Sequence, residues 1–313
     1  MLRWGADAPQ RRALDVCMNS SLRIKLRQIA KNRYEYLWIL PGLALVLFLT
    51  FYAAAFSIRI SFYDYNLSSS ERPFIGLSNY VDLFSANSSY LPSLGRTFLF
   101  MLFDVPLPIV MGMGLAIALN RKLALRSTFR STFLLPWIMS MVAAGYMLKW
   151  IFDDVSGLAN YAIKSVGLNP VRWLSSPVFA FITVLIADVW KTFPFSMIVL
   201  LAALQSIPLE LYEAAHIDGA SPWTQFFRIT LPLVRHHVMV LLILRSLRSF
   251  AMIDLIIVMT GGGPGAATEL LSFHMYQTAF TFFELGRAAA MGLTVLFINI
   301  ALSLFYIRVV GSE

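Results

Sequence analysis

Six stretches of predominantly apolar residues divide the chain, and each is long enough for a helix that crosses a bilayer. A hydrocarbon core about 30 Å thick needs roughly 20 residues of helix, because each residue rises about 1.5 Å. The stretches cover residues 37–56, 96–120, 130–152, 177–205, 238–260 and 288–307. The pattern therefore predicts an all-α membrane protein with six transmembrane helices.

A few ionisable residues interrupt the second, fourth and fifth stretches. They are Asp104, Asp188, Lys191, Arg245, Arg248 and Asp254. Ionisable groups inside a membrane are costly, so they usually face a cavity or a partner. Arg245 is nearer the expected cytoplasmic end of its helix, where we expect its long side chain to reach the interface.

Composition excludes a soluble enzyme and a metal site. Of the 313 residues, 58% are hydrophobic and 13% are charged, whereas about a quarter of an average soluble chain is charged. A single cysteine, Cys17, and four scattered histidines leave no disulfide framework and no expected metal ligands. His236 and His237 are adjacent, so on a helix they point roughly 100° apart, which indicates an interfacial position rather than a catalytic pair.

The net charge of +8 reflects how the basic residues are distributed between the loops. Residues 1–36 carry eight Lys and Arg residues, whereas the loops expected on the opposite side carry fewer, among them Arg72, Lys164 and Arg172. Because cytoplasmic loops are enriched in basic residues, both termini are predicted to be cytoplasmic, in a multi-pass protein of the bacterial inner membrane. No nucleic-acid partner is expected. Residues 20–36 form either a helix on the anionic inner leaflet or a solvated basic arm.

The fourth connection, residues 206–237, has the signals of two short helices. Pro208 favours a helix start, and a first helix is expected over Leu211–Ile217, stopped by Asp218 and Gly219. Ser221 followed by Pro222 predicts the cap of a second helix that runs through Ile229 and ends at Leu231-Pro232. A helix, a glycine corner and a second helix indicate a surface on which another protein docks.

The motif in this connection resembles that of a known family. Residues 213–220, Glu-Ala-Ala-His-Ile-Asp-Gly-Ala, followed by Ile-Thr-Leu-Pro at 229–232, are similar to the EAA loop of permease subunits in binding-protein-dependent ABC importers. The resemblance extends over about residues 94–306 and implies the type I ABC importer permease fold. Residues 203–208 and 188–191 resemble the carbohydrate-uptake branch, and Thr-Gly-Gly-Gly-Pro at 260–264 resembles its maltose-type first permease.

This resemblance implies the partners and a division of labour between subunits. The partners are a second permease subunit in a heterodimer, two cytoplasmic ATPase subunits and an extracytoplasmic solute-binding protein. No cofactor is expected on this chain, which has no phosphate-binding loop motif; ATP and Mg²⁺ belong to the ATPases. The residues expected to couple to the ATPases are Glu213, Ala214, Ala215, Asp218, Gly219, Ile229, Leu231 and Pro232. Glu213 is either a contact to a basic group or a solubilising side chain.

The resemblance also implies a saccharide-binding site. Its positions are Trp137, Met141, Asp188, Lys191, Thr192, Phe195, Arg248, Ser249 and Met252. Lys191 and Arg248 depart from the largely neutral maltose-type pattern, which raises an acidic ligand such as a uronate oligosaccharide or a glycerol phosphate. The other interpretation pairs Lys191 with Asp188, and Arg248 with Asp254 or another chain, and leaves a neutral saccharide.

The expected organisation has four parts. They are a basic cytoplasmic segment at 1–36, the first transmembrane helix with an extracytoplasmic loop at 37–93, the permease core at 94–306 with its coupling loop at 206–237, and a cytoplasmic tail at 307–313. The main prediction is alternating access driven by partner ATPases, with no catalysis on this chain. The alternative from another class is an ion-coupled secondary transporter that uses Asp104 or Asp188 as a proton carrier.

Overall fold

The computed structural model describes residues 33–121 and 125–310, with side chains from residue 38. Most of the predicted basic segment 1–36, with its candidate surface helix, and residues 311–313 of the predicted tail lie outside the described residues. The chain forms two compact units, one ending at Ser57 and the other beginning at Ile58. The described residues contain isolated bridges, Tyr63 with Phe74 and Asn66 with Glu284, and no continuous strand.

The predicted first, second, fourth and sixth spans are all helical. They correspond to α2 (Arg33–Ile60), to α4 (Tyr90–Asp104) with α5 (Pro106–Asn120), to α9 (Pro177–Gln205) and to α15 (Leu285–Val310). Within the described part of the chain, five helices are long and apolar enough to cross a membrane, and the α6–α7 pair adds a sixth if it is one span. The fold prediction is therefore confirmed in its helical class, and the described helices provide five or six spans.

The third predicted span is not one straight helix. It divides into α6 (Arg126–Ile138) and α7 (Met141–Ile151), which are bent by 96° relative to each other. Met139 and Ser140 have extended backbone angles, ψ 149° and 142°, so neither can continue the helix. Hydropathy alone misses this break because apolar residues lie on both sides of it.

The fifth predicted span is wrong at both ends. Helical structure begins with α11 (Pro222–Gln225), passes through the π-helix η1 (Phe226–Thr230) and continues as α12 (Leu231–Ser249), while α13 (Asp254–Met259) is separate. Leu231 and Pro232 therefore do not end the second loop helix. Proline has no N–H for the usual bond four residues back, and the wider π turn, in which the Leu231 N–H bonds to the Phe226 carbonyl, admits it without a break.

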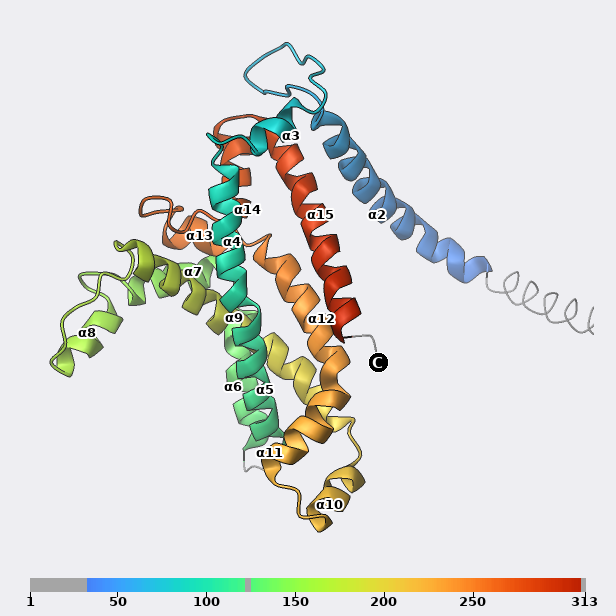
Figure 1. Cartoon of the computed structure of the whole chain (residues 1–313), viewed down its shortest axis with the longest axis vertical. Helices are drawn as coiled ribbons and strands as arrows, with labels where there is room; N and C mark the ends of the chain where they lie inside the picture. Colours follow the sequence, from blue (N-terminus) through green and yellow to red (C-terminus); the bar gives the residue numbers. More distant parts are fainter. Residues whose placement is uncertain (1–32, 122–124, 311–313) are drawn as a thin grey trace, which may run out of the picture. The chain divides into compact units, whose positions relative to one another are not determined.

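The remaining short helices lie at the ends of the second unit and at its side. These are α3 (Ser78–Leu83), α8 (Leu158–Ser165), α10 (Leu209–Ile217), α14 (Leu271–Tyr276) and the π-helix η2 (Gln277–Thr281). In Figure 1, α10 and α11 are at the lower end of this unit, and α3 and α14 are towards the upper end. The long helices α4, α5, α12 and α15 run between these ends.

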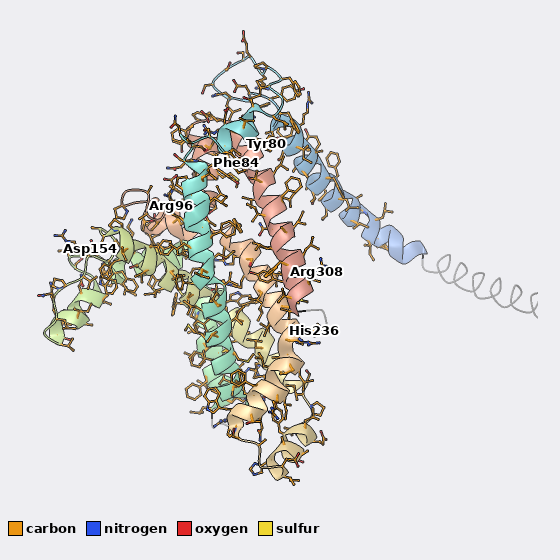
Figure 2. The ribbon with its side chains drawn as sticks, viewed as in Figure 1. Tyr80, Phe84, Arg96, Asp154, His236 and Arg308 are labelled. Carbon is orange, nitrogen blue, oxygen red and sulfur yellow. The ribbon has the colours of Figure 1, made fainter. Side chains whose placement is uncertain are left out.

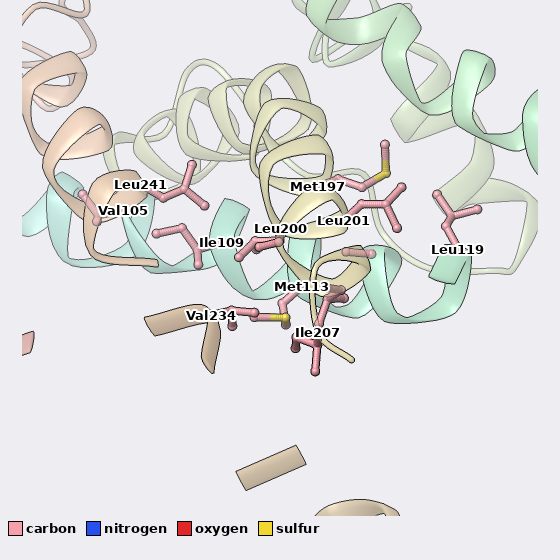
Figure 3. Packing of buried hydrophobic residues seen from close by; sticks show 13 residues of the cluster. Val105, Ile109, Met113, Leu119, Met197, Leu200, Leu201, Ile207, Val234 and Leu241 are labelled. Atoms are coloured by element: carbon pink, nitrogen blue, oxygen red, sulfur yellow. The ribbon is translucent and has the colours of Figure 1, made fainter. Parts of the chain in front are cut away.

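The main core joins α5, α9 and α12, and Figure 3 shows its packing. Its buried members include Met113, Met197, Leu200 and Leu241. Helices α5 and α9 approach closely because Gly112 has no side chain: a Cβ there would lie 2.7 Å from the Met197 nitrogen. This contact fixes α9, and α9 carries Asp188, Lys191 and Thr192, three of the polar residues described next.

Candidate functional site

A cavity of about 290 Å³ opens among α6, α7, α9 and α12. Its lining residues are Trp137, Met141, Lys191, Thr192, Phe195, Leu244, Arg245 and Arg248. Six of them belong to the nine positions predicted to hold substrate. The break between α6 and α7 brings Trp137 and Met141, one from each side of it, onto the same wall.

One wall of the cavity is aromatic. The rings of Trp137 and Phe195 stack with centroids 5.8 Å apart and planes 27° apart, and Trp137 is 47% exposed. The Lys191 ammonium donates to the Trp137 carbonyl over 2.9 Å. That bond ties the end of α6, just before the bend, to the middle of α9.

Behind the cavity lies a buried cluster of two carboxylates and two guanidinium groups. Arg245 Nη2 donates to Asp104 Oδ1 at 2.5 Å and to Asp188 Oδ2 at 2.9 Å, and Arg248 Nη2 donates to Asp188 Oδ1 at 3.0 Å. Ser249 completes the cluster by donating its hydroxyl to Asp104 Oδ2 at 2.5 Å. We call these five residues the ion cluster. It joins α4, α9 and α12 by charge-assisted hydrogen bonds in a low-dielectric environment, where such bonds are strong.

The ion cluster corrects three expectations. Asp188 pairs with Arg245 and Arg248 and forms no salt bridge with Lys191, and Arg248 pairs with Asp188 rather than with Asp254. Arg245 does not reach the interface; it is 3% exposed. Spacing along one helix suggested the Asp188–Lys191 pair, but the carboxylate turns towards α12, which brings two cations instead of one.

Three of the predicted substrate positions lie away from the cavity wall. Ser249 is 1% exposed and is used within the ion cluster, and Met252 is 4% exposed within a second apolar core around Leu255 and Ile256. Asp188 lies behind the wall and reaches it only through Arg245 and Arg248. The structure thus brings the nine positions into one region, in which six line the cavity and three lie behind its wall.

Sequence reasoning missed the roles of Arg245, Asp104 and Leu244. The signal for the first two was present: Asp104 is the lone charge of its span, and Arg245 is a cation in another span. Buried charges of opposite sign on separate transmembrane helices pair with each other. Leu244 carried no comparable signal, because any apolar residue suits its place.

The coupling loop has the predicted helix, corner and helix. Its first helix, α10, begins at Leu209, earlier than expected, and ends with Asp218 as its C-cap. Gly219 has φ +73°, a left-handed conformation that glycine adopts without steric cost. The Ser221 hydroxyl accepts the Thr224 N–H over 3.2 Å, as an N-cap does.

A hydrogen bond connects the coupling loop to the helix behind it. The hydroxyls of Tyr212 in α10 and Thr230 in η1 are 2.9 Å apart. Tyr212 also packs against the main core. The first loop helix is therefore braced against the π turn from which α12 begins.

The outer surface of the loop is exposed and partly apolar. Glu213, Ala214, Asp218 and Gly219 are exposed, and Ile217 is 85% exposed. On the second helix, Trp223 and Phe227 stack with centroids 6.2 Å apart and are 73% and 58% exposed. Contiguous exposed apolar residues are typical of an interaction surface.

The histidines and carboxylates form no metal site in the part of the chain that the structure describes, since no three His, Cys, Asp or Glu side chains converge there. Figure 2 shows His236 on the lower half of α12 and Asp154 on the segment that carries α8. His236 and His237 are both exposed and do not line the cavity.

Membrane-spanning helices around a partly polar cavity, with a protruding loop of two short helices, define a transport permease. The chain belongs to the family of binding-protein-dependent transport system inner membrane components, whose model matches residues 108–310. It is an ABC importer permease and a multi-pass protein of the inner membrane. The resemblance seen in the sequence is confirmed.

Relatives match nearly the whole chain. The trehalose/maltose transport system permease protein MalF of Thermococcus litoralis is 35% identical over 295 residues, which cover 93% of this chain and 98% of the relative. The sulfoquinovosyl glycerol transport system permease protein SmoG of Agrobacterium fabrum is 32% identical over 278 residues, 88% of this chain and 90% of the relative.

A solved structure shares the fold. It is the crystal structure of a bacterial ABC transporter involved in the import of the acidic polysaccharide alginate, and one of its chains matches with a TM-score of 0.77 at 23% identity. The match covers 92% of this chain and 98% of that chain. At this identity the similarity establishes the ABC importer permease fold.

Proposed function

We propose that this chain is a permease subunit that passes a sugar or oligosaccharide into the cytoplasm by alternating access. The observation that carries the proposal is the cavity, which is lined by the stacked Trp137 and Phe195 together with the polar side chains of Lys191, Thr192 and Arg248. Aromatic faces suit the C–H surfaces of sugars, and a few convergent polar groups suit hydroxyls. The relatives named for trehalose/maltose and for sulfoquinovosyl glycerol support a glycoside.

The proposed substrate site keeps all nine predicted positions but gives them two roles. Trp137, Met141, Lys191, Thr192, Phe195 and Arg248 contact the sugar from the wall. Asp188, Ser249 and Met252 position that wall from behind.

The proposed partners follow from the family and from the coupling loop. A binding-protein-dependent permease receives its solute from an extracytoplasmic binding protein, and a second permease subunit closes the open side of the cavity. Of the two ATPase subunits, which hold ATP and Mg²⁺, one docks on the coupling loop of this chain. This arrangement puts the loop and both termini in the cytoplasm, as the basic residues of the loops predict.

The docking proposal is supported by the form of the loop. The exposed Glu213 offers a charge-assisted contact, Ala214 and Ala215 permit close approach, and Gly219 sets the angle after Asp218. Ile229, Leu231 and Pro232 lie where η1 leads into α12, so they connect the docking surface to the transport helix.

Reconstitution tests the transport proposal. Proteoliposomes that contain this permease, its second permease, the ATPases and the binding protein are assayed for uptake of radiolabelled maltose, trehalose and other glycosides. We expect uptake with ATP and Mg²⁺ on the ATPase side and without an ion gradient. Uptake driven by a proton gradient in the absence of ATP would support the secondary transporter instead.

Crosslinking tests the docking proposal separately. In a Cys17→Ser background, Glu213→Cys carries a short crosslinker, and Glu71→Cys, exposed on another loop, is the control. We expect capture of an ATPase subunit from position 213 only. Failure of position 213 to capture it in an active complex would contradict docking at α10.

A further inference from the structure

Lys191 is a cation in the cavity wall without a carboxylate partner. Its hydrogen bond goes to the neutral Trp137 carbonyl, and no salt bridge to Lys191 is found among the described residues. An ammonium group has three donors, so two remain after that bond. No Asp or Glu side chain lies among the cavity-lining residues.

The two arginines of the wall also have unused donors. Nε and Nη1 of Arg245 and Nε of Arg248 are buried and make no hydrogen bond within the described residues. Arg245 is 3% exposed, so bulk water does not solvate these groups freely. A buried charged donor without a partner is costly, which favours an acceptor-rich ligand beside it.

The charges of the ion cluster and the wall do not cancel. Arg245 and Arg248 are matched by Asp104 and Asp188, and the charge of Lys191 is left over. The excess is positive, and it lies on the main-chain carbonyl of Trp137, whose ring stacks with Phe195 in the same cavity. The wall therefore complements a molecule with an apolar ring face and a negative group.

We propose that the cavity is specific for an acidic glycoside, a sugar that carries a carboxylate, sulfonate or phosphate group. Lys191 binds the acidic group, Arg248 donates to it or to an adjacent hydroxyl, and Trp137 packs on the sugar ring. Arg245 lies deeper and presents its unused donors from behind. This inference rests on the proposed function and adds to it the chemical class of the sugar.

The test compares glycosides that differ only at one carbon. Glucosyl glycerol and its analogues with a carboxylate, sulfonate or phosphate at C6 are supplied to the reconstituted complete transporter, and uptake of each is measured with ATP. We expect the unaltered transporter to prefer one or more of the acidic members. The members also show which acidic group it prefers.

Substitutions locate that preference in the permease rather than in the binding protein. We expect Lys191→Met to lower uptake of the acidic glycosides by about 10-fold or more relative to uptake of glucosyl glycerol, the usual effect of losing a hydrogen bond to a charged group. Lys191→Arg keeps the charge and should retain most of the preference. Lys164→Met, the same change at an exposed lysine, should have no effect.

The outcomes separate this inference from the proposed function. Uptake of glucosyl glycerol alone, or an equal loss for all members in Lys191→Met, would overturn the acidic class and leave the sugar permease intact. No uptake of any glycoside would overturn the proposed function, and the inference with it. If Lys191→Met does not assemble, Lys191→Gln, which keeps a hydrogen-bond donor but removes the charge, makes the same comparison.

Discussion

Arg245 donates through one nitrogen, Nη2, to both the carboxylate and the main-chain carbonyl of Asp104, the latter over 2.9 Å. That carbonyl needs an outside donor, because Pro108, four residues further on, has no N–H to complete the helical bond. The two prolines at the start of α5 thus provide no N–H for the helical carbonyls before them, and Arg245 of α12 donates to one of these carbonyls. The same arginine then holds Asp188 on α9.

Removal of Arg245 should destabilise the assembled protein more than any exposed charge change. Arg245→Met leaves two buried carboxylates without their shared cation, for which we expect a loss of about 3–5 kcal/mol. Thermal unfolding of the purified complex measures it, with the exposed Arg308→Met as the control. Adding Asp104→Leu to Arg245→Met should recover part of the loss; a double variant that is less stable than the single one would argue against the pairing.

Two glycines on α5 should respond in opposite ways to the same change. At Gly112 a Cβ would meet the Met197 nitrogen at 2.7 Å and the Ser196 Cβ at 2.8 Å, whereas at Gly114 nothing lies within 4 Å. Gly112→Ala should force α5 from α9 and lower thermal stability. Gly114→Ala should be neutral or stabilising by about 0.5–1 kcal/mol through helix propensity. Equal stability of the two variants would contradict the close approach.

Gly219→Asp should abolish stimulation of ATP hydrolysis by the solute while leaving membrane insertion intact. Its φ of +73° costs free energy for a residue with a Cβ, and the aspartate also adds a negative charge at the exposed corner between α10 and α11. Gly167→Asp is the matched control and should leave the stimulation intact. Gly167 has φ +80°, no atom within 4 Å of a Cβ, and a position outside the coupling loop. Full stimulation in Gly219→Asp would count against docking.

Tyr212→Phe should weaken coupling without removing the docking surface. It deletes the 2.9 Å hydroxyl contact with Thr230 but keeps the ring in the main core, at an expected loss of about 0.5–1.5 kcal/mol. We expect a several-fold lower ratio of solute-stimulated to basal ATP hydrolysis. Tyr161→Phe, at a tyrosine that is 75% exposed, should leave that ratio unchanged. An unaltered ratio in both variants would show that the contact between Tyr212 and Thr230 has no role in coupling.

Acid should loosen the turn that precedes α8. The Ser156 backbone N–H, the Ser156 hydroxyl and the Val155 N–H bond to the Asp153 carboxylate and hold the pKa of Asp153 below its ordinary value. A lowered pKa in the folded state contributes stability at pH above the unfolded value of about 3.9, and the contribution is lost as the pH falls through the folded pKa. Amide exchange at Val155 and Ser156, corrected for intrinsic rates, should therefore accelerate in acid.

Asp153→Asn is the control for this turn. Its side chain does not titrate, so its exchange rates after the same correction should show little dependence on pH. Wild-type protection that is constant down to the lowest pH would contradict the role of the carboxylate.

How far the sequence predicts this structure depends on whether a feature is determined by neighbouring residues or by residues far away in the sequence. Long apolar stretches such as 288–307 predict helices because the need to satisfy backbone groups in lipid acts on every residue alike. The corner at Gly219 is also predictable, since one residue sets it. The bend after Ile138 is not, because apolar residues continue on both sides of it.

The candidate site was predictable in its residue types but not in its pairings. Trp137, Lys191 and Arg248 were identified through their place in motifs, and they do line one cavity. The Asp188–Lys191 pair was wrong because helix spacing considers one helix at a time. Which cation reaches Asp188 is decided by how α12 packs against α9, and that depends on side chains far away in the sequence.

The unbroken helical run from Pro222 to Ser249 has a mechanical consequence. Thr230, which contacts Tyr212, lies near its start, and Arg245 and Arg248 lie near its end. The contact with the loop and the arginines therefore belong to one continuous helix. If this helix tilts when an ATPase moves its N-terminal end, the guanidinium groups of Arg245 and Arg248 near its C-terminal end change their partners at the same time. A transporter built in this way would grip and release its cargo through one stroke.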